Sequence, residues 1–306
     1  MDRRDFLAGA AVATLSAAVR AGAQPADLDN TQPELQKGRR PNVLLFMSDQ
    51  HKSSCMGAAG DPVAVTPNLD AFARESVRFT SVYCTNPVCG PSRASMLTGL
   101  FNHHLGDPGG HNYTYAPRYQ TMPGRFSRAG YLTGLIGKMH FGDAQLHGFD
   151  YQLEFNDWFQ YLGPKIKLYA DEMGRPGSGA GLPQILGLWD KGDPWKGLRE
   201  PDGRLGPVAV GRPSVMEEED HFESFVADET VHFLETYAEG DQPFFLVSSF
   251  LKPHDPFMPA KRFAEMFPPE QMKLSPTWGK ADLDNIPRRV RVAIESCHYT
   301  PELLKP

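Results

Sequence analysis

The sequence predicts an α/β domain in which a mostly parallel central sheet is flanked by helices. Three apolar runs, residues 43–47, 131–136 and 244–250, have the length and composition of buried strands. Segments with helix signals lie between these runs. Strands that alternate with helices favour parallel pairing, because each helical crossover returns the chain to the same end of the sheet.

The N-terminal residues 1–23 predict a twin-arginine signal peptide. Arg3–Arg4 precede an apolar run over residues 8–19, and Ala21–Ala23 forms an A-x-A cleavage site. The alternative is a buried N-terminal helix, but the run is too small-sided to pack well and too short to span a membrane. Residues 24–40 are polar and predict a loose lead-in. We therefore expect a periplasmic or secreted protein that uses the twin-arginine export machinery.

The first half of the mature chain predicts two strands and two helices. Val43–Met47 is a continuous apolar run, typical of a central strand that is buried on both faces. The following elements come in this order: a helix over 67–73 with Thr66 as cap and Pro67 in its first turn, an alternating strand over 77–83, and a helix over 91–100 that ends at Gly99.

The second half predicts a strand over 131–136, a helix over 220–237 and a strand over 244–250. Residues 156–215 are rich in Gly, Pro and Trp without clear periodicity, and they predict long surface excursions. Asp49 and His254 follow the ends of predicted strands. In a parallel sheet such positions carry the functional loops.

Composition excludes several classes of protein. The net charge of −6 argues against a nucleic-acid binder, which would show a basic surface. Four cysteines in 306 residues do not make a disulfide scaffold. Beyond the extreme N-terminus no apolar run reaches about 18 residues, so no stable membrane insertion is expected.

The segment from Cys89 to Gly99 is the most informative stretch. Cys89 lies just before a predicted helix start, where backbone N–H groups and the helix dipole favour an anion. Arg93, one turn into the helix, adds a fixed positive charge. An anionic nucleophile or a bound oxyanion would be stabilised there. The alternative is a buried structural cysteine beside a helix terminus.

This segment resembles the signature of the sulfatase family, in the alkaline phosphatase superfamily. Its pattern is Cys89-x-Pro91-Ser92-Arg93 followed by Leu97-Thr98-Gly99. Further segments match the family in order: Pro41 to Gln50, Thr66 to Ala73, Gly137-Lys138-Met139-His140, His147 to Tyr151, and Lys252-Pro253-His254-x-Pro256-Phe257. The resemblance covers about residue 40 to about residue 290.

The resemblance implies hydrolysis of a sulfate ester of a small molecule or carbohydrate. A formylglycine-generating enzyme would oxidise Cys89 to formylglycine, whose hydrate supplies two hydroxyls. One hydroxyl attacks sulfur and expels the alcohol. Deprotonation of the other re-forms the aldehyde and releases sulfate, so that one hard step becomes two easier ones.

The resemblance also assigns roles to individual residues. Asp49, Gln50 and residue 89 would hold Ca²⁺ or another divalent cation. The remaining site residues would act as follows: Arg93 would stabilise the ionised hydrate, Lys138 would contact the sulfate and residue 89, His140 would remove the second hydroxyl's proton, and His254 would contact the sulfate and protonate the leaving oxygen.

Gln50 is also compatible with a different activity. Many family members carry Asp at that position, and Gln occurs in some sulfatases and in related phosphonate monoesterases. The alternative is therefore a phosphonate or phosphate monoester hydrolase. His103, His104 and His111 are expected to face water. Cys55, Cys84 and Cys297 lack metal-ligand spacing.

The C-terminal part departs from the family. A late strand followed by Asp, then Asn or His, then Gly, is missing. Asp284–Asn285 follows no apolar strand and precedes Ile286, so we reject it as a metal pair. We therefore expect residues 41–306 to form a partial catalytic domain that lacks the family's late strands and C-terminal subdomain. A catalytically inactive fragment is the third alternative.

Overall fold

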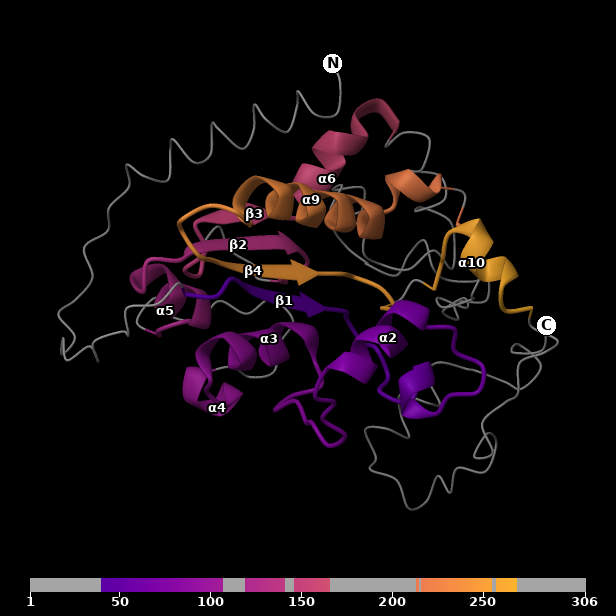
Figure 1. Ribbon diagram of the computed structural model, residues 1–306, viewed down its shortest axis with the longest axis horizontal. Coiled ribbons are helices and arrows are strands. Elements are labelled where there is room, and N and C mark those ends of the chain that lie inside the picture. Colours follow the sequence, from indigo (N-terminus) through magenta and orange to yellow (C-terminus); the bar gives the residue numbers. More distant parts are fainter. Residues whose placement is uncertain are drawn as a thin grey trace, which may run out of the picture. The chain divides into compact units, whose positions relative to one another are not determined.

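The computed structural model describes residues 40–106, 119–140, 146–165, 213–214, 216–254 and 257–268 (Figure 1). They belong to two compact units. The first comprises residues up to Trp158 together with Phe225–Leu251, and the second comprises Phe159–Ser224 and the residues from Lys252 onward. The predicted signal peptide, residues 1–23, lies outside the described residues, as does the lead-in up to residue 39.

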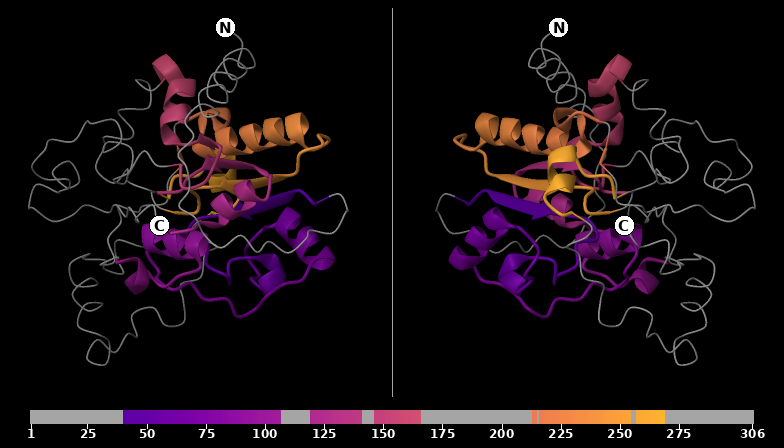
Figure 2. Two further views of the ribbon diagram at one scale, coloured as in Figure 1. Left: turned by 90° about the vertical axis from the view of Figure 1, so that its left-hand side faces the viewer. Right: turned by 90° about the vertical axis from the view of Figure 1, so that its right-hand side faces the viewer.

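A four-stranded parallel sheet organises the first unit, which confirms the predicted fold class. The strands, in spatial order, are β1 (Val43–Met47), β4 (Phe244–Ser249), β2 (Leu132–Gly137) and β3 (Tyr151–Leu153). Figures 1 and 2 show α9 (Phe222–Tyr237) over one face of this sheet and α3 (Cys89–Thr98) over the other. All four carboxyl ends therefore point to the same edge.

The position of β1 differs from the prediction of a central strand buried on both faces. Within the described sheet, β1 is the outermost strand beside β4, and its side chains alternate in burial. Leu44 and Phe46 are 41% and 58% exposed. Val43, Leu45 and Met47 pack on the core from the other face. The two inner strands are β4, whose six residues are all buried, and β2.

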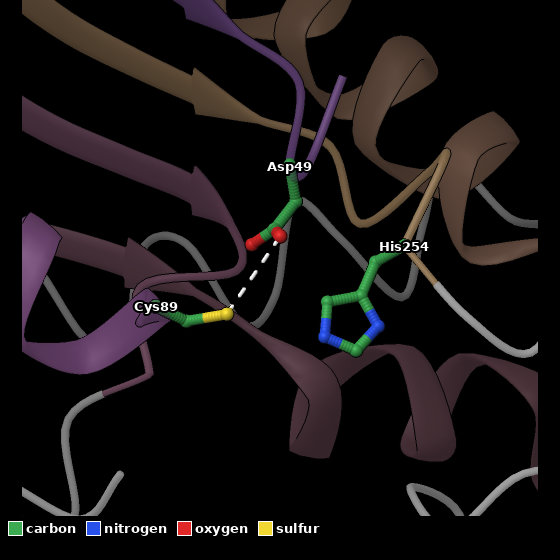
Figure 3. A group of neighbouring side chains, drawn as sticks. All are labelled: Asp49, Cys89 and His254. Atoms are coloured by element: carbon green, nitrogen blue, oxygen red, sulfur yellow. Dashed lines mark hydrogen bonds between the residues drawn. The ribbon is translucent and has the colours of Figure 1, made fainter. Parts of the chain in front are cut away.

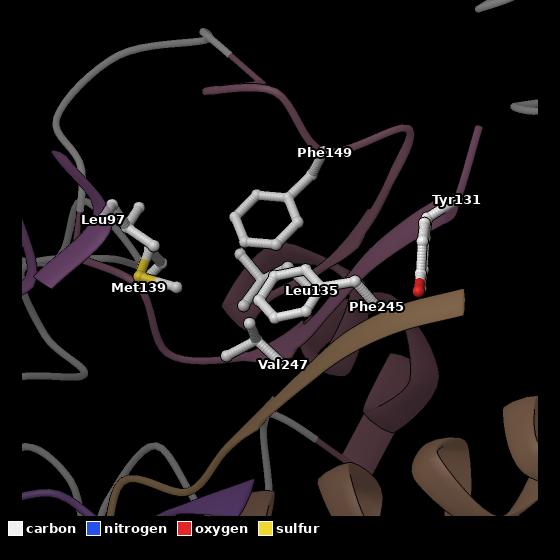
Figure 4. Packing of buried hydrophobic residues seen from close by; sticks show 7 residues of the cluster. All are labelled: Leu97, Tyr131, Leu135, Met139, Phe149, Phe245 and Val247. Carbon is white, nitrogen blue, oxygen red and sulfur yellow. The ribbon is translucent and has the colours of Figure 1, made fainter. Parts of the chain in front are cut away.

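One cluster of buried side chains joins the sheet to the helices beneath it (Figure 4). Its members come from α3, β2, β4, the residues beside β2 and the segment before β3: Leu97, Tyr131, Leu135, Met139, Phe149, Phe245 and Val247. The ring of Phe126, on α5 (Met122–Arg128), stacks on that of Phe245 with centroids 4.3 Å apart. Burial of this apolar surface stabilises the packing of α3 against the sheet and so fixes its position.

The three predicted helices are present with small changes. Helix α3 ends at Gly99 as predicted, in a left-handed conformation, but begins at Cys89, two residues earlier than expected. Cys89 is therefore the first helical residue instead of preceding the helix. Helix α2 (Pro67–Glu75) has Pro in its first turn. The Thr66 side chain donates to Asp70 instead of capping the helix.

Two predictions for irregular segments are wrong. Residues 77–83 form no strand, since the described part of the sheet offers them no partner, and Val77, Phe79 and Tyr83 are more than three-quarters exposed. The start of the supposed surface excursion is helical in α6 (Phe155–Leu162). The remaining short elements were not predicted: β3, η1 (Gly57–Ala59), α4 (Asn102–Leu105), α5, η2 (Gly163–Lys165), η4 (Glu218–Asp220) and α10 (Lys261–Glu265).

In the second unit, ion pairs tie the short helices together. The Asp220 carboxylate is 1% exposed and accepts hydrogen bonds from Lys165 Nζ at 2.8 and 2.9 Å. Arg262 on α10 binds Glu218 on η4. Across the described residues of both units, no helix combines the length and apolarity needed to cross a membrane.

Gly137 at the end of β2 has a stringent steric requirement. Its φ is +106°, and an added Cβ would overlap the carbonyl oxygen of Ser249. We expect Gly137→Ala to lower the free energy of unfolding in urea by more than the roughly 1–2 kcal/mol that left-handed backbone alone costs alanine. Gly60→Ala is the matched control, because Gly60 has φ +91° and no atom near its missing Cβ. Equal losses in the two variants would contradict the clash.

Candidate active site

The candidate site lies at the carboxyl edge of the sheet. Asp49 follows β1, Lys138 follows β2, and Ser249 ends β4. The three residues are each at most 6% exposed. In parallel sheets this edge is where functional side chains from successive strands meet.

Helix α3 contributes Cys89 and Arg93 to the same place. Arg93 is 4% exposed, and its guanidinium has three oxygen partners. Nη1 donates to the carbonyl of Lys138 and, at 2.9 Å, to Ser249 Oγ, while Nη2 donates to Asp49 Oδ2 at 2.9 Å. Because the partners come from three strand ends, the guanidinium is fixed before any ligand arrives.

Asp49 is the anion of this cluster. Its Oδ2 accepts from Arg93 at 2.9 Å and from Lys138 Nζ at 3.0 Å. Burial raises the pKa of the Asp49 carboxyl, but Lys138 and Arg93 together outweigh burial and hold that pKa below its usual value. Two buried cations face one carboxylate, so the cluster keeps one net positive charge. Such a charge favours an anionic ligand.

The Cys89 sulfur lies between the opposite charges of this cluster. Sγ is 3.7 Å from Asp49 Oδ1 and 3.7 Å from Lys138 Nζ. Figure 3 shows the Cys89 side chain pointing from the start of α3 toward the Asp49 carboxylate. The structure thus brings together four predicted site residues: Asp49, Cys89, Arg93 and Lys138.

Gln50 and His140 occupy strained positions beside this cluster. Gln50 follows Asp49 and has φ 53°. His140 lies three residues after the end of β2 and has φ 66°. Non-glycine residues rarely adopt left-handed backbone, and such residues concentrate at functional sites. Their roles stay predictions. His254 belongs to the second unit, and its part in the site also stays a prediction.

The remaining candidates have the following outcomes. His103 and His104 are exposed on α4, as predicted, and His111 lies outside the described residues. Cys55 and Cys84 are exposed and form no disulfide with another described cysteine. Cys297 and the rejected pair Asp284–Asn285 also lie outside the described residues.

Two residues were not predicted, one in the site and one beside it. Ser249 is the last residue of β4, and the strand-end rule that indicated Asp49 would also have indicated it. Glu154 follows β3, and its Oε2 accepts from the peptide N–H of Met139 at 3.3 Å. No periodicity or motif marks Glu154, because β3 is only three residues long.

One carboxylate oxygen at this edge, Asp49 Oδ1, suits a hard divalent cation. Both cationic side chains bind Oδ2 of Asp49, while Oδ1 faces residue 89. Carboxylate and amide oxygens suit Ca²⁺ or Mg²⁺. A thiolate is a soft ligand, so residue 89 would suit such an ion only after gaining oxygen in place of sulfur.

Comparisons with known proteins agree on one family. The family model described as Sulfatase matches residues 41–304. An arylsulfatase from Clostridium perfringens is 32% identical over 246 residues, which cover 76% of this chain and 47% of that protein. The chain thus spans about half the length of this curated relative.

Solved structures show the same fold. A protein in complex with its substrate D-glucosamine-2-N,6-O-disulfate matches with a TM-score of 0.55 and 26% identity, over 82% of this chain and 42% of that one. A phosphonate monoester hydrolase of Agrobacterium radiobacter matches with a TM-score of 0.57 and 23% identity, over 77% and 45%. Because the phosphonate monoester hydrolase is only 23% identical to this chain, its similarity concerns the fold alone.

Proposed function

Because the chain belongs to the sulfatase family, as the match over residues 41–304 shows, we propose that it hydrolyses a sulfate ester at Cys89. One observation carries this proposal: the Cys89 sulfur lies 3.7 Å from both Asp49 Oδ1 and Lys138 Nζ, within a cluster that keeps a net positive charge. A nucleophile at this position lies beside fixed positive charges, which stabilise the anionic ester that it attacks.

The proposal includes oxidation of Cys89 to formylglycine and a divalent cation, which the family implies. Asp49, Gln50 and residue 89 would hold the ion, which we take to be Ca²⁺. When both groups are in place, one hydroxyl of the hydrated aldehyde would supply the nucleophile, and the other would allow sulfate to be released afterwards. The ion would act as a Lewis acid that stabilises negative charge.

The other residues bind the sulfate and move protons. Arg93 stabilises the ionised hydrate at residue 89, Lys138 contacts both the sulfate and residue 89, and Asp49 keeps both cations oriented. His140 takes the proton from the second hydroxyl at residue 89, and His254 donates a proton to the leaving oxygen. The left-handed backbone at His140 supports a functional constraint there.

The proposed substrate is a sulfated carbohydrate or a small sulfate ester. The names of the relatives support this class: arylsulfatase, and a structure bound to D-glucosamine-2-N,6-O-disulfate. We place the reaction in the periplasm or outside the cell. The signal peptide over residues 1–23 would use the twin-arginine route, which carries proteins that are already folded and modified.

A phosphonate or phosphate monoester is the second candidate substrate. Gln50 favours it, and the fold of the Agrobacterium radiobacter phosphonate monoester hydrolase is compatible with it. The positively charged cluster would accept either anion. The two substrates differ in the charge and geometry of the transferred group, so relative rates on matched esters separate them.

The test is to co-express the full chain with a formylglycine-generating enzyme and to measure residue 89 by mass spectrometry. Calcium-dependent hydrolysis of a chromogenic aryl sulfate is then compared with that of the matched phosphonate ester. Faster turnover of the sulfate supports the proposal, and faster turnover of the phosphonate supports the alternative. Aldehyde at residue 89 without turnover of either ester, and without calcium binding by calorimetry, indicates an inactive fragment.

A further inference from the structure

The segment Lys138–His140 carries two of the proposed site residues beyond the end of β2. Two contacts hold the backbone of its first residue, Lys138. The Lys138 N–H donates to the carbonyl of Ser249 at 2.9 Å, and the Lys138 carbonyl accepts from Arg93. These contacts fix one end of the segment against β4 and α3. The other end of the segment, at Met139 and His140, needs a separate contact.

The peptide of Met139 is held by a carboxylate. The Met139 side chain is 0% exposed in the core, so its N–H group needs a partner inside the protein. Glu154 Oε2 supplies that partner at 3.3 Å, from the segment directly after β3. The next residue, His140, has φ 66°. A non-glycine residue keeps this backbone only where neighbouring contacts enforce it.

Glu154 is itself anchored and faces a small set of charges. Its N–H donates to Asp157 Oδ2 at 2.8 Å at the start of α6. Burial raises the pKa of the Glu154 carboxyl to about 7; the hydrogen bond from Met139 lowers it, Asp157 raises it and Arg93 lowers it to smaller extents. The carboxyl therefore changes charge close to neutral pH.

We propose that Glu154 is a positioning residue for the reaction: its carboxylate holds the Met139 peptide, fixes Lys138 and His140 at the sheet edge, and makes turnover rise with pH through neutrality. The inference rests on the proposed function. Glu154 touches neither residue 89 nor its charged partners directly among the contacts described; it acts through the peptide between Lys138 and His140.

The pH dependence follows from the strength of the hydrogen bond. An ionised carboxylate accepts a hydrogen bond roughly twice as strong as that of a neutral acceptor. Above neutral pH the Met139 peptide is therefore held firmly. Below it the protonated carboxyl holds the segment less tightly, so Lys138 and His140 spend less time in the productive arrangement.

The first variant is Glu154→Gln in the matured full chain, with kcat and KM measured across neutral pH. Glutamine keeps an acceptor oxygen and loses the charge. At alkaline pH we expect kcat to fall about tenfold, which corresponds to roughly 1.4 kcal/mol, with KM changed less than about twofold. The acidic limb of the kcat profile assigned to Glu154 should disappear. Glu154→Asp should retain part of that limb, and the exposed Glu75→Gln should match the wild type.

A second measurement does not depend on activity. Hydrogen exchange at the Met139 amide should be slower at pH above 7 than below it in the wild type, after correction for intrinsic exchange. Glu154→Gln should exchange faster and lose this difference. An unchanged kcat profile together with unchanged Met139 protection would overturn the proposal. If the wild type forms the aldehyde but turns over no ester, the proposed function fails, and Met139 protection alone decides the role of Glu154.

Discussion

Cys89→Ala removes sulfate ester hydrolysis from the matured chain, with an expected loss in kcat of about four orders of magnitude or more. Alanine offers no atom that can attack sulfur. Cys89→Ser separates nucleophilic attack from release. A serine hydroxyl can form one S–O bond and expel the alcohol, but it has no second hydroxyl through which sulfate can leave. Incubation with the aryl sulfate should therefore add one sulfate to residue 89, detectable by mass spectrometry.

The control for this prediction is the exposed thiol of Cys55. Cys55→Ala should keep full activity, because Cys55 lies outside the charged cluster. Both Cys89 variants should melt near the wild-type temperature, since the cluster retains the ion pairs of Asp49 with Arg93 and Lys138. Undiminished turnover by Cys89→Ala, in protein shown to be free of wild-type chain, would remove Cys89 from the mechanism.

The elements that could be predicted from the sequence are those whose signals are local. A few consecutive residues are enough to recognise the apolar runs of β1, β2 and β4 and the glycine after α3. The position of a strand in the sheet is not local. The run of β1 has the composition of a central strand, yet β4 and β2 occupy the inner positions of the described sheet. Residues 77–83 alternate like a strand but form none, because pairing depends on a partner and not on propensity alone.

The site divides in the same way. Asp49 and Arg93 could be predicted because strand ends and helix starts point to a common edge. Lys138 is indicated only by the resemblance of Gly137–His140 to the family. Glu154 could not, because its contact with Met139 joins two loops that the chain brings together only after folding. Ser249 lies 156 residues from Arg93 in sequence, so their hydrogen bond depends on where β4 lies in the sheet and on how α3 packs against it.

Asp49→Asn should have the largest combined effect on stability and activity. Asparagine keeps the shape of the side chain but leaves Arg93 and Lys138 buried without their counter-charge. Breaking a buried ion pair from one side costs about 3–5 kcal/mol, and we expect a loss of that order in the free energy of unfolding. Because the pKa of Asp49 is lowered in the folded protein, its contribution is present at neutral pH and is lost as pH falls through that value. The difference between variant and wild type should therefore shrink in acid.

The double variant Asp49→Asn/Lys138→Met separates stability from function. Methionine removes one of the two unpaired cations and should recover part of the free energy of unfolding measured in urea. It should not recover hydrolysis, because the proposed ligand to the divalent ion and the sulfate-binding ammonium are both gone. We expect kcat/KM for the aryl sulfate to stay at least roughly a thousandfold below wild type in both variants. Calcium binding by calorimetry should be lost in both, and retained calcium binding by Asp49→Asn would show that the ion is held elsewhere.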